Sequence, residues 1–330
     1  MTLSMSHTFQ LYTQEPHFEQ TMQQDVMAVW KQRDEGFIKS FDKKTKLYWC
    51  SLNCPSHSKA IVLVNGRLES AWKYQELFYE LFKQGYDVYS FDHRGQGLSD
   101  RLLSDAHKGH VEDFEDYLLD MDRLIQHFKL EQYERRFLMA HSLGGAIATR
   151  YLQTRPAHHF DAIVACAPMF GVNIPWYFAP LALPLSMILT LLSPQPRYAP
   201  GYQQYDPKPF KNNRLTHSDI RYHWFRKLYA QYPNLQLGGP TTRWVWQGLL
   251  ASKQCILLTR QVKIPFLLLQ AGDDRVVSNQ AQHRFIRKLR RTNPDVDLVT
   301  IKGSRHELLF ECDGYRDQAL RHALDFFARH

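Results

Sequence analysis

The chain has 330 residues, of which 44% are hydrophobic and 22% are charged, a composition typical of a soluble globular enzyme. A chain of this length can bury a large core, either as one α/β domain with an insertion or as two domains. Its formal net charge of +8 predicts attraction to something anionic, with nucleic acid and an acidic lipid surface as candidates. We interpret the densest basic run, residues 284–291, as the solvated face of one helix.

The cysteines argue against two kinds of site. The 5 cysteines are widely spaced, without a CxxC pair or an accompanying histidine cluster, so we expect neither a disulfide framework nor a metal. No other cofactor is predicted. The N-terminal residues show no basic start followed by an apolar run, which indicates no secretory signal and favours a reduced cytosolic setting.

Short apolar runs alternate with longer amphipathic segments, which predicts a mostly parallel sheet covered by helices. An antiparallel hairpin is expected over residues 36–52, with its turn at Asp42–Thr45. Six further strands are predicted at 60–64, 86–91, 136–140, 161–167, 264–270 and 296–301.

Two segments between these strands show helical spacing of apolar residues. Residues 71–85 place a stripe of aromatic and leucine side chains on one face and end at Gly85, which suits a C-cap. Residues 111–128 repeat this pattern. The alternation stops between 168 and 262 and then resumes, which predicts a core in two parts (1–167 and 263–330) with a helical cap inserted at 168–262.

The cap contains the apolar run 174–193, which is long enough to cross a bilayer. Pro175, Pro180 and Pro184 interrupt it, and proline breaks the backbone hydrogen bonding that a membrane span requires. We therefore interpret this run as an apolar surface element or lid.

Ser142 lies where an apolar strand turns into a helical pattern, in the stretch "AHSLGG". Such a corner strains the backbone of the serine and projects its side chain above the sheet, provided that its neighbours are small. Ala140 and Gly144 occupy those positions, so the stretch departs from G-x-S-x-G by one methyl group. The alternative is a flexible turn in which the serine only caps a helix.

An acid and a histidine follow Ser142 at matching structural places. Asp273 and Asp274 come directly after the strand predicted at 264–270, and His306 follows the strand predicted at 296–301. The order Ser, Asp, His along the chain is that of α/β-hydrolases. We assign the acid to Asp274, which precedes "RVV", and interpret Asp273 as a turn former.

These residues predict acyl transfer through a covalent serine intermediate. His306 would accept the Ser142 proton, Asp274 would orient the imidazole, and water or another alcohol would resolve the acyl-enzyme. The oxyanion would be bound by the backbone N–H groups of Leu143 and Arg67, the latter in the loop that begins at Gly66. His141 adjoins the serine, but neighbouring side chains diverge at such a corner, so it is not expected to reach the hydroxyl.

Several further stretches, "VNGRLES", "DHRGQGLSDR", "APMFG" and "GSRHELLFE", together with "AHSLGG", resemble the bacterial lysophospholipases related to monoacylglycerol lipases. The resemblance runs from about residue 15 to the C-terminus. It implies an α/β-hydrolase fold with an inserted helical cap and hydrolysis of the acyl ester of lysophospholipids, with acyl transfer to another lipid as a further outcome. Asn65, where monoacylglycerol lipases carry histidine, and Ala140 depart from that family's pattern.

The resemblance also implies peripheral attachment to the cytoplasmic face of a bacterial inner membrane. We therefore expect an anionic lipid surface, not nucleic acid, as the partner; the oligomeric state is left open.

The alternatives for the activity are a monoacylglycerol lipase and a general carboxylesterase or thioesterase. The cap's apolar side chains are candidates for an acyl trench or for plain packing: Trp176, Tyr177, Phe178, Leu181, Leu185, Ile188 and Leu189. Three tryptophans are candidates for interfacial or cation–π contacts or for the core: Trp224, Trp244 and Trp246.

Overall fold

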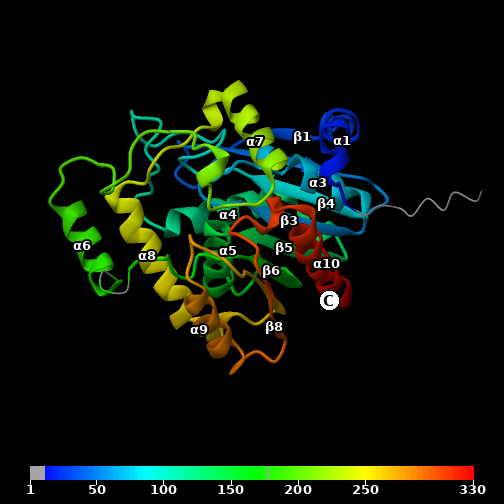
Figure 1. Ribbon diagram of the computed structural model, residues 1–330. Helices are drawn as coiled ribbons and strands as arrows, with labels where there is room; N and C mark the ends of the chain where they lie inside the picture. Colours follow the sequence, from blue (N-terminus) through cyan, green and yellow to red (C-terminus); the bar gives the residue numbers. More distant parts are fainter. Residues whose placement is uncertain (1–11, 176, 178) are drawn as a thin grey trace, which may run out of the picture.

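An eight-stranded sheet forms the centre of the molecule (Figure 1). The computed structural model describes residues 12–175, 177 and 179–330. The strands are β1 (Asp34–Lys39), β2 (Lys46–Leu52), β3 (Lys59–Val64), β4 (Tyr86–Phe91), β5 (Arg135–His141), β6 (Ala162–Cys166), β7 (Phe266–Ala271) and β8 (Val296–Ile301). Each lies where the sequence predicts a strand.

The spatial order of the strands is β1-β2-β4-β3-β5-β6-β7-β8. β1 pairs with β2, and β2 with β4, in antiparallel fashion, whereas every pairing from β4 to β8 is parallel. The parallel strands β3, β6 and β7 are buried and mostly apolar because helices cover both faces of a parallel sheet. The predicted mostly parallel sheet with an antiparallel hairpin is confirmed.

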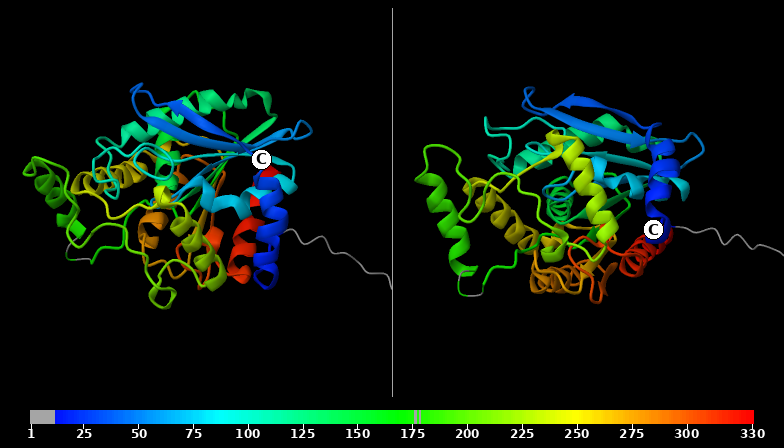
Figure 2. Two further views of the ribbon diagram at one scale, coloured as in Figure 1. Left: turned by 90° about the horizontal axis from the view of Figure 1, so that it is seen from above. Right: turned by 45° about the horizontal axis from the view of Figure 1, so that its top comes forward.

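Helices surround the sheet (Figures 1 and 2). They are α1 (Phe18–Thr21), α2 (Met27–Trp30), α3 (Gln75–Lys83), α4 (Glu115–Phe128), α5 (Leu143–Thr154), α6 (Ala179–Leu191), α7 (Asp219–Gln231), α8 (Thr242–Leu257), α9 (Asn279–Leu289) and α10 (Asp313–Arg329). A π-helical turn, Met22–Val26, joins α1 to α2, and a 3-10 turn, Ala71–Tyr74, precedes α3. The two helices predicted at 71–85 and 111–128 correspond to this turn with α3 and to α4.

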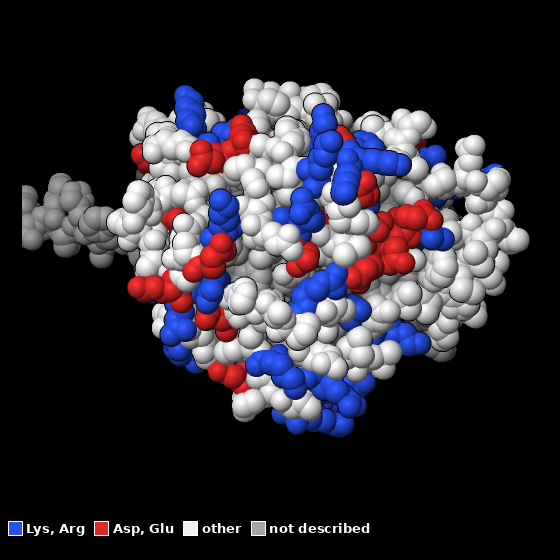
Figure 3. Space-filling model, turned by 180° about the vertical axis from the view of Figure 1, so that it is seen from behind, with Lys and Arg blue, Asp and Glu red and all other residues white. Residues whose placement is uncertain are grey.

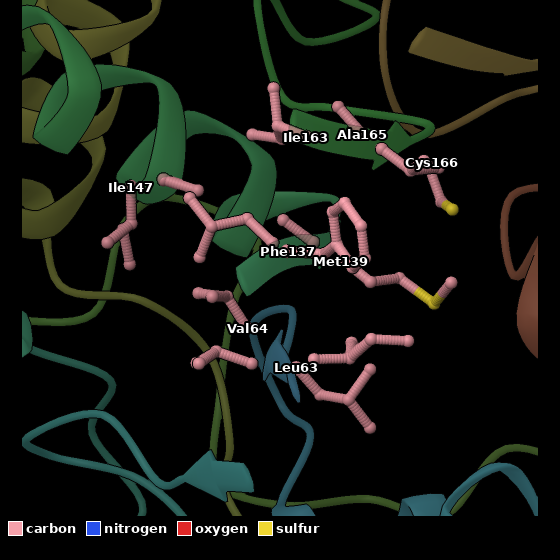
Figure 4. Packing of buried hydrophobic residues seen from close by; sticks show 14 of the residues in the cluster. Leu63, Val64, Phe137, Met139, Ile147, Ile163, Ala165 and Cys166 are labelled. Carbon is pink, nitrogen blue, oxygen red and sulfur yellow. The ribbon is translucent and has the colours of Figure 1, made fainter. Parts of the chain in front are cut away.

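The core lies between the sheet and its covering helices. Figure 4 shows Leu63 and Val64 of β3, Phe137 and Met139 of β5 and Ile147 of α5 packed together. Ala165 and Cys166 of β6 belong to the same cluster, so Cys166 is the buried strand residue that the sequence predicts. This packing fixes the carboxyl ends of β3, β5 and β6 beside one another, and these ends carry the candidate site.

Between β6 and β7 the chain leaves the sheet and forms α6, α7 and α8. In Figures 1 and 2, α6 stands at one end of the molecule beside α8, against which it packs. α8 in turn buries Ala251 and Cys255 in the main core. The division into core and cap at residues 168 and 262 stays a prediction.

The basic run 284–291 lies on α9 and the turn after it. Phe285, Ile286 and Leu289 are buried, while Arg284 and Arg287 are exposed on the opposite face. Lys and Arg side chains gather along the lower edge of the molecule in Figure 3, where α9 lies. The run is the solvated face of one amphipathic helix, as predicted.

Candidate active site

Ser142 occupies the corner between β5 and α5. Its backbone has φ 51° and ψ −114°, a combination that non-glycine residues rarely adopt. The chain packs tightly at this corner. The Ser142 N–H donates to the Cys166 carbonyl at 3.0 Å. Position 144 has no room for a side chain, because a Cβ on Gly144 would lie 2.0 Å from the Val64 carbonyl oxygen. Ala140 is a buried strand residue, and its methyl group is accommodated in the sheet. The corner therefore holds the serine above the strand ends.

The structure brings Ser142, Asp274 and His306 together. The His306 Nε2 lies 2.9 Å from the Ser142 hydroxyl oxygen, and its Nδ1 lies 2.8 Å from Asp274 Oδ2. A carboxylate only accepts hydrogen bonds, so Nδ1 carries the proton and Nε2 is left to accept from the serine. This is the relay geometry that activates a serine hydroxyl.

Asp274 and Asp273 have different environments. The Asp274 side chain is fully buried, and its Oδ1 accepts from the N–H groups of Val276 and Val277. Burial acts to raise the pKa of Asp274, but the hydrogen bond and charge of His306 and these two N–H groups outweigh it, so the pKa is lowered. Asp273 is half exposed and pairs with Arg275.

The two predicted oxyanion donors flank this corner. Leu143 is the first residue of α5, where a backbone N–H has no partner within the helix. Arg67 follows Gly66 in the loop after β3, and Gly66 faces the corner so closely that a Cβ there would lie 3.0 Å from His141 Nδ1. Within the described part of the chain, neither N–H donates to a protein acceptor.

A buried charged cluster behind the site was not singled out from the sequence. Glu69 Oε1 binds Lys73 at 3.0 Å, and Lys73 also binds Glu307 at 2.9 Å. Glu69 Oε2 accepts from the Gly66 N–H at 2.5 Å and lies 3.1 Å from His141 Nδ1. His141 Nε2 lies 3.1 Å from the His306 carbonyl oxygen. The cluster thus joins the loop after β3, the serine corner and the histidine loop.

Neighbouring polar groups hold the loop after β3. His93 Nε2 lies 2.9 Å from the Asn65 carbonyl oxygen, and burial lowers the pKa of His93 to about 4, so this ring is neutral. Gln96 donates to the Gly66 carbonyl at 2.8 Å. The stretch "DHRGQG", which includes both residues, therefore shapes the loop that carries Arg67.

Comparisons with known proteins show the fold and the family of the chain. A family model described as "Serine aminopeptidase, S33" matches residues 55–313. Among solved structures, a lipase in an open form superposes with a TM-score of 0.72 at 17% identity, covering 90% of this chain and 98% of that one. A monoacylglycerol lipase from Paleococcus ferrophilus gives 0.68 at 22% identity, covering 86% and 99%. The fold is that of the α/β-hydrolases, and the protein is a hydrolase.

Sequence relatives define the group more closely. Lysophospholipase L2 of Escherichia coli K12 is 39% identical over 311 residues, which cover 91% of this chain and 89% of that protein. A probable lysophospholipase L2 of Haemophilus influenzae is 33% identical, covering 93% and 96%. Human monoglyceride lipase is 26% identical over 268 residues, covering 79% of this chain and 78% of that protein. The chain belongs to the serine aminopeptidase S33 family and, within it, to the lysophospholipase L2 proteins.

Proposed function

We propose that this protein is a lysophospholipase that hydrolyses the acyl ester through an acyl-enzyme on Ser142. The observation that carries the proposal is the unbroken chain of hydrogen bonds from Asp274 through His306 to the Ser142 hydroxyl, at 2.8 and 2.9 Å. Membership of the lysophospholipase L2 proteins supports the lysophospholipid as substrate.

The geometry supports a two-step reaction. Ser142 Oγ attacks the ester carbonyl while its proton passes to His306 Nε2, and the Leu143 and Arg67 N–H groups bind the oxyanion. The C–O bond to the glycerol breaks, His306 returns the proton to the leaving oxygen, and the glycerophosphodiester departs. Water, deprotonated by His306, then attacks the acyl-enzyme and releases the fatty acid. A second lipid's hydroxyl in place of water would give acyl transfer.

The proposal includes peripheral attachment to an anionic membrane at the cytoplasmic face of the inner membrane. Among the described residues, no helix is long and apolar enough to span a bilayer. The stripe Leu181, Leu185, Ile188 and Leu192 on and just after α6 is exposed, with exposed fractions from 47% to 77%. α6 contains no charged residue, and the end of the molecule where it lies is mostly uncharged in Figure 3.

Two further features support this attachment. The net charge of +8 favours an anionic surface, by about 1 kcal/mol for each basic residue that lies close to it. The free thiols of Cys50, Cys166 and Cys255 suit a reducing compartment. Trp176 and Phe178, also candidates for lipid contact, lie outside the described residues.

The test compares lysophosphatidylethanolamine with a short soluble ester, each assayed below and above the aggregation threshold of the lipid. We expect hydrolysis of the lysophospholipid to rise steeply above the threshold, while the short ester shows no such rise. Ser142→Ala should lose about 10³-fold or more of the activity on both substrates, because only oxyanion and binding contributions remain. A soluble carboxylesterase or thioesterase would prefer the short ester, and full activity of Ser142→Ala would refute the assignment of the nucleophile.

A further inference from the structure

The Arg67 side chain is a mostly buried cation without an acidic partner. Among the described residues, its guanidinium forms no ion pair; Nη2 donates a hydrogen bond to the Gly238 carbonyl at 2.5 Å, and the guanidinium carbon lies 5.1 Å from the centre of the Trp244 ring. The Nε is sealed from solvent and has no hydrogen-bond partner. Burial lowers the pKa of Arg67 to about 10, so the group stays protonated at neutral pH.

Two arginines that are fully buried are compensated by carboxylates, whereas the buried Arg150 binds the Gln153 side-chain oxygen at 2.8 Å and forms no ion pair among the described residues. Arg221 binds Glu76 and Asp313, each at 2.9 Å, and Arg316 binds Glu80 at 2.6 Å. A buried charge without a counter-ion costs free energy, which is why such charges are normally paired. Arg67 has no carboxylate partner among the described residues, so an anion from outside the chain could pair with it.

The position of Arg67 indicates which molecule supplies that partner. Its own backbone N–H is one of the two proposed oxyanion donors. The Trp244 ring beside its guanidinium and the Met169 methyl carbon both border Gly248, because a Cβ there would lie 3.5 Å from the ring and 3.6 Å from the methyl carbon. The Met169 N–H donates to the Ser142 carbonyl at 2.9 Å. Arg67 thus combines a backbone N–H proposed to bind the oxyanion with a side chain that contacts Gly238 and Trp244.

We propose that Arg67 binds the phosphodiester of the substrate's head group and so makes the enzyme select phosphate-bearing lysolipids over neutral acylglycerols. This inference rests on the proposed lysophospholipase function. A guanidinium donates charge-assisted hydrogen bonds to phosphate oxygens, and Nη1 has no protein acceptor among the described residues. In a lysophospholipid the phosphate is attached to the same glycerol as the scissile ester, so both groups reach the site together.

The test is a change of selectivity in Arg67→Met, which keeps an apolar stem and the backbone N–H but removes the charge. The substrates are a lysophosphatidylethanolamine and a monoacylglycerol with the same short acyl chain, both below their aggregation thresholds. We expect the ratio of kcat/KM for the phospholipid over the acylglycerol to fall roughly 10- to 100-fold, the loss typical of a hydrogen bond to a charged group. Arg67→Lys should restore part of the ratio.

The matched control is Arg243→Met. Arg243 also stacks on a cap tryptophan, Trp246, at 5.1 Å, but it is paired with Glu112 at 2.7 Å. Its removal should leave the selectivity ratio unchanged. An equal fall of kcat/KM for both substrates in Arg67→Met would overturn the proposal. It would mean that the Arg67 side chain only holds the loop against Gly238, a structural role that affects both substrates equally. A wild-type enzyme that cleaves neither lipid, whether below or above the aggregation threshold, would instead refute the proposed function.

A second measurement, inhibition of the wild-type protein, does not depend on the folding of any variant. Glycerophosphoethanolamine should inhibit hydrolysis of a short soluble ester by the wild-type protein competitively, whereas glycerol at the same concentration should not. Equal effects of the two compounds would contradict the assignment of Arg67 to the phosphate. Because this assay uses the short ester, it stays informative even if the preferred lipid differs from the one proposed.

Discussion

At the scale of single residues, Ser142 and His306 are 164 positions apart in the chain and share a hydrogen bond. Their meeting could be predicted because each follows a strand of one parallel sheet, and the carboxyl ends of such strands lie at the same edge. The contact between His141 and Glu69, 72 positions apart, could not, because it depends on side-chain directions that leave no periodic pattern. The groups proposed to react can therefore be predicted from the sequence, whereas the groups that hold them in place cannot.

The protonation of His141 follows from its two neighbours. The Glu69 carboxylate and the His306 carbonyl oxygen accept hydrogen bonds only, so both ring nitrogens of His141 must donate. Burial acts to lower the pKa of His141, but the charge of Glu69 outweighs it and the pKa is raised. His141 is therefore an imidazolium that positions the backbone of His306.

We predict that His141→Gln lowers kcat roughly 10- to 100-fold with little change in KM, because a neutral amide cannot hold both partners as the imidazolium does. The control is His57→Gln. His57 pairs with Asp87 at 2.9 Å beside the first residues of β3 and β4, at the edge of the sheet opposite Ser142. Steady-state kinetics on a soluble ester, with thermal unfolding of each variant, checks the prediction. An equal loss of kcat in both variants would show that only stability is affected.

Among the helices and strands, the apolar run 174–193 is one whose structure the sequence predicts only in part. The prolines that argue against a membrane span leave a helix of 13 residues with Pro184 inside it. The sequence could not say which apolar residues face outward, because the whole run is hydrophobic and has no polar face to orient it. The packing of α6 against α8 determines which side chains are exposed, and the stripe that includes Leu185 faces outward.

We predict that replacing Leu181, Leu185 and Ile188 by serine weakens binding to vesicles that contain anionic phospholipid by tenfold or more. Burial of each such side chain stabilises the bound state by about 1.5–3 kcal/mol when complete. Vesicle flotation checks the prediction, and activity on a short soluble ester should stay near that of the wild type. Phe37→Ser, which removes an exposed side chain on β1, should bind as the wild type does. Equal binding of the triple variant would exclude α6 as the contact.

At the scale of the whole molecule, alternating apolar and amphipathic segments were enough to predict a parallel sheet with an antiparallel hairpin. The spatial order of the strands cannot be predicted from this alternation. In the sheet, β4 lies between β2 and β3, and this placement depends on how the connections between strands cross the sheet. Charged residues on α3, α7 and α10 also pair in the interior, as Glu76, Arg221 and Arg316 do. The spacing of residues along a helix shows on which face a charged residue lies. It does not reveal the oppositely charged residue, distant in sequence, that compensates its charge in the interior.

Segments far apart in the chain converge on Ser142, and we propose that they activate its hydroxyl. The most direct measurement is reaction with a fluorophosphonate, followed by intact mass and a peptide map. The account predicts one adduct, on Ser142, which is absent in Ser142→Ala and forms at least about 100-fold more slowly in His306→Gln. An adduct on another residue, or labelling of His306→Gln at the wild-type rate, would contradict it.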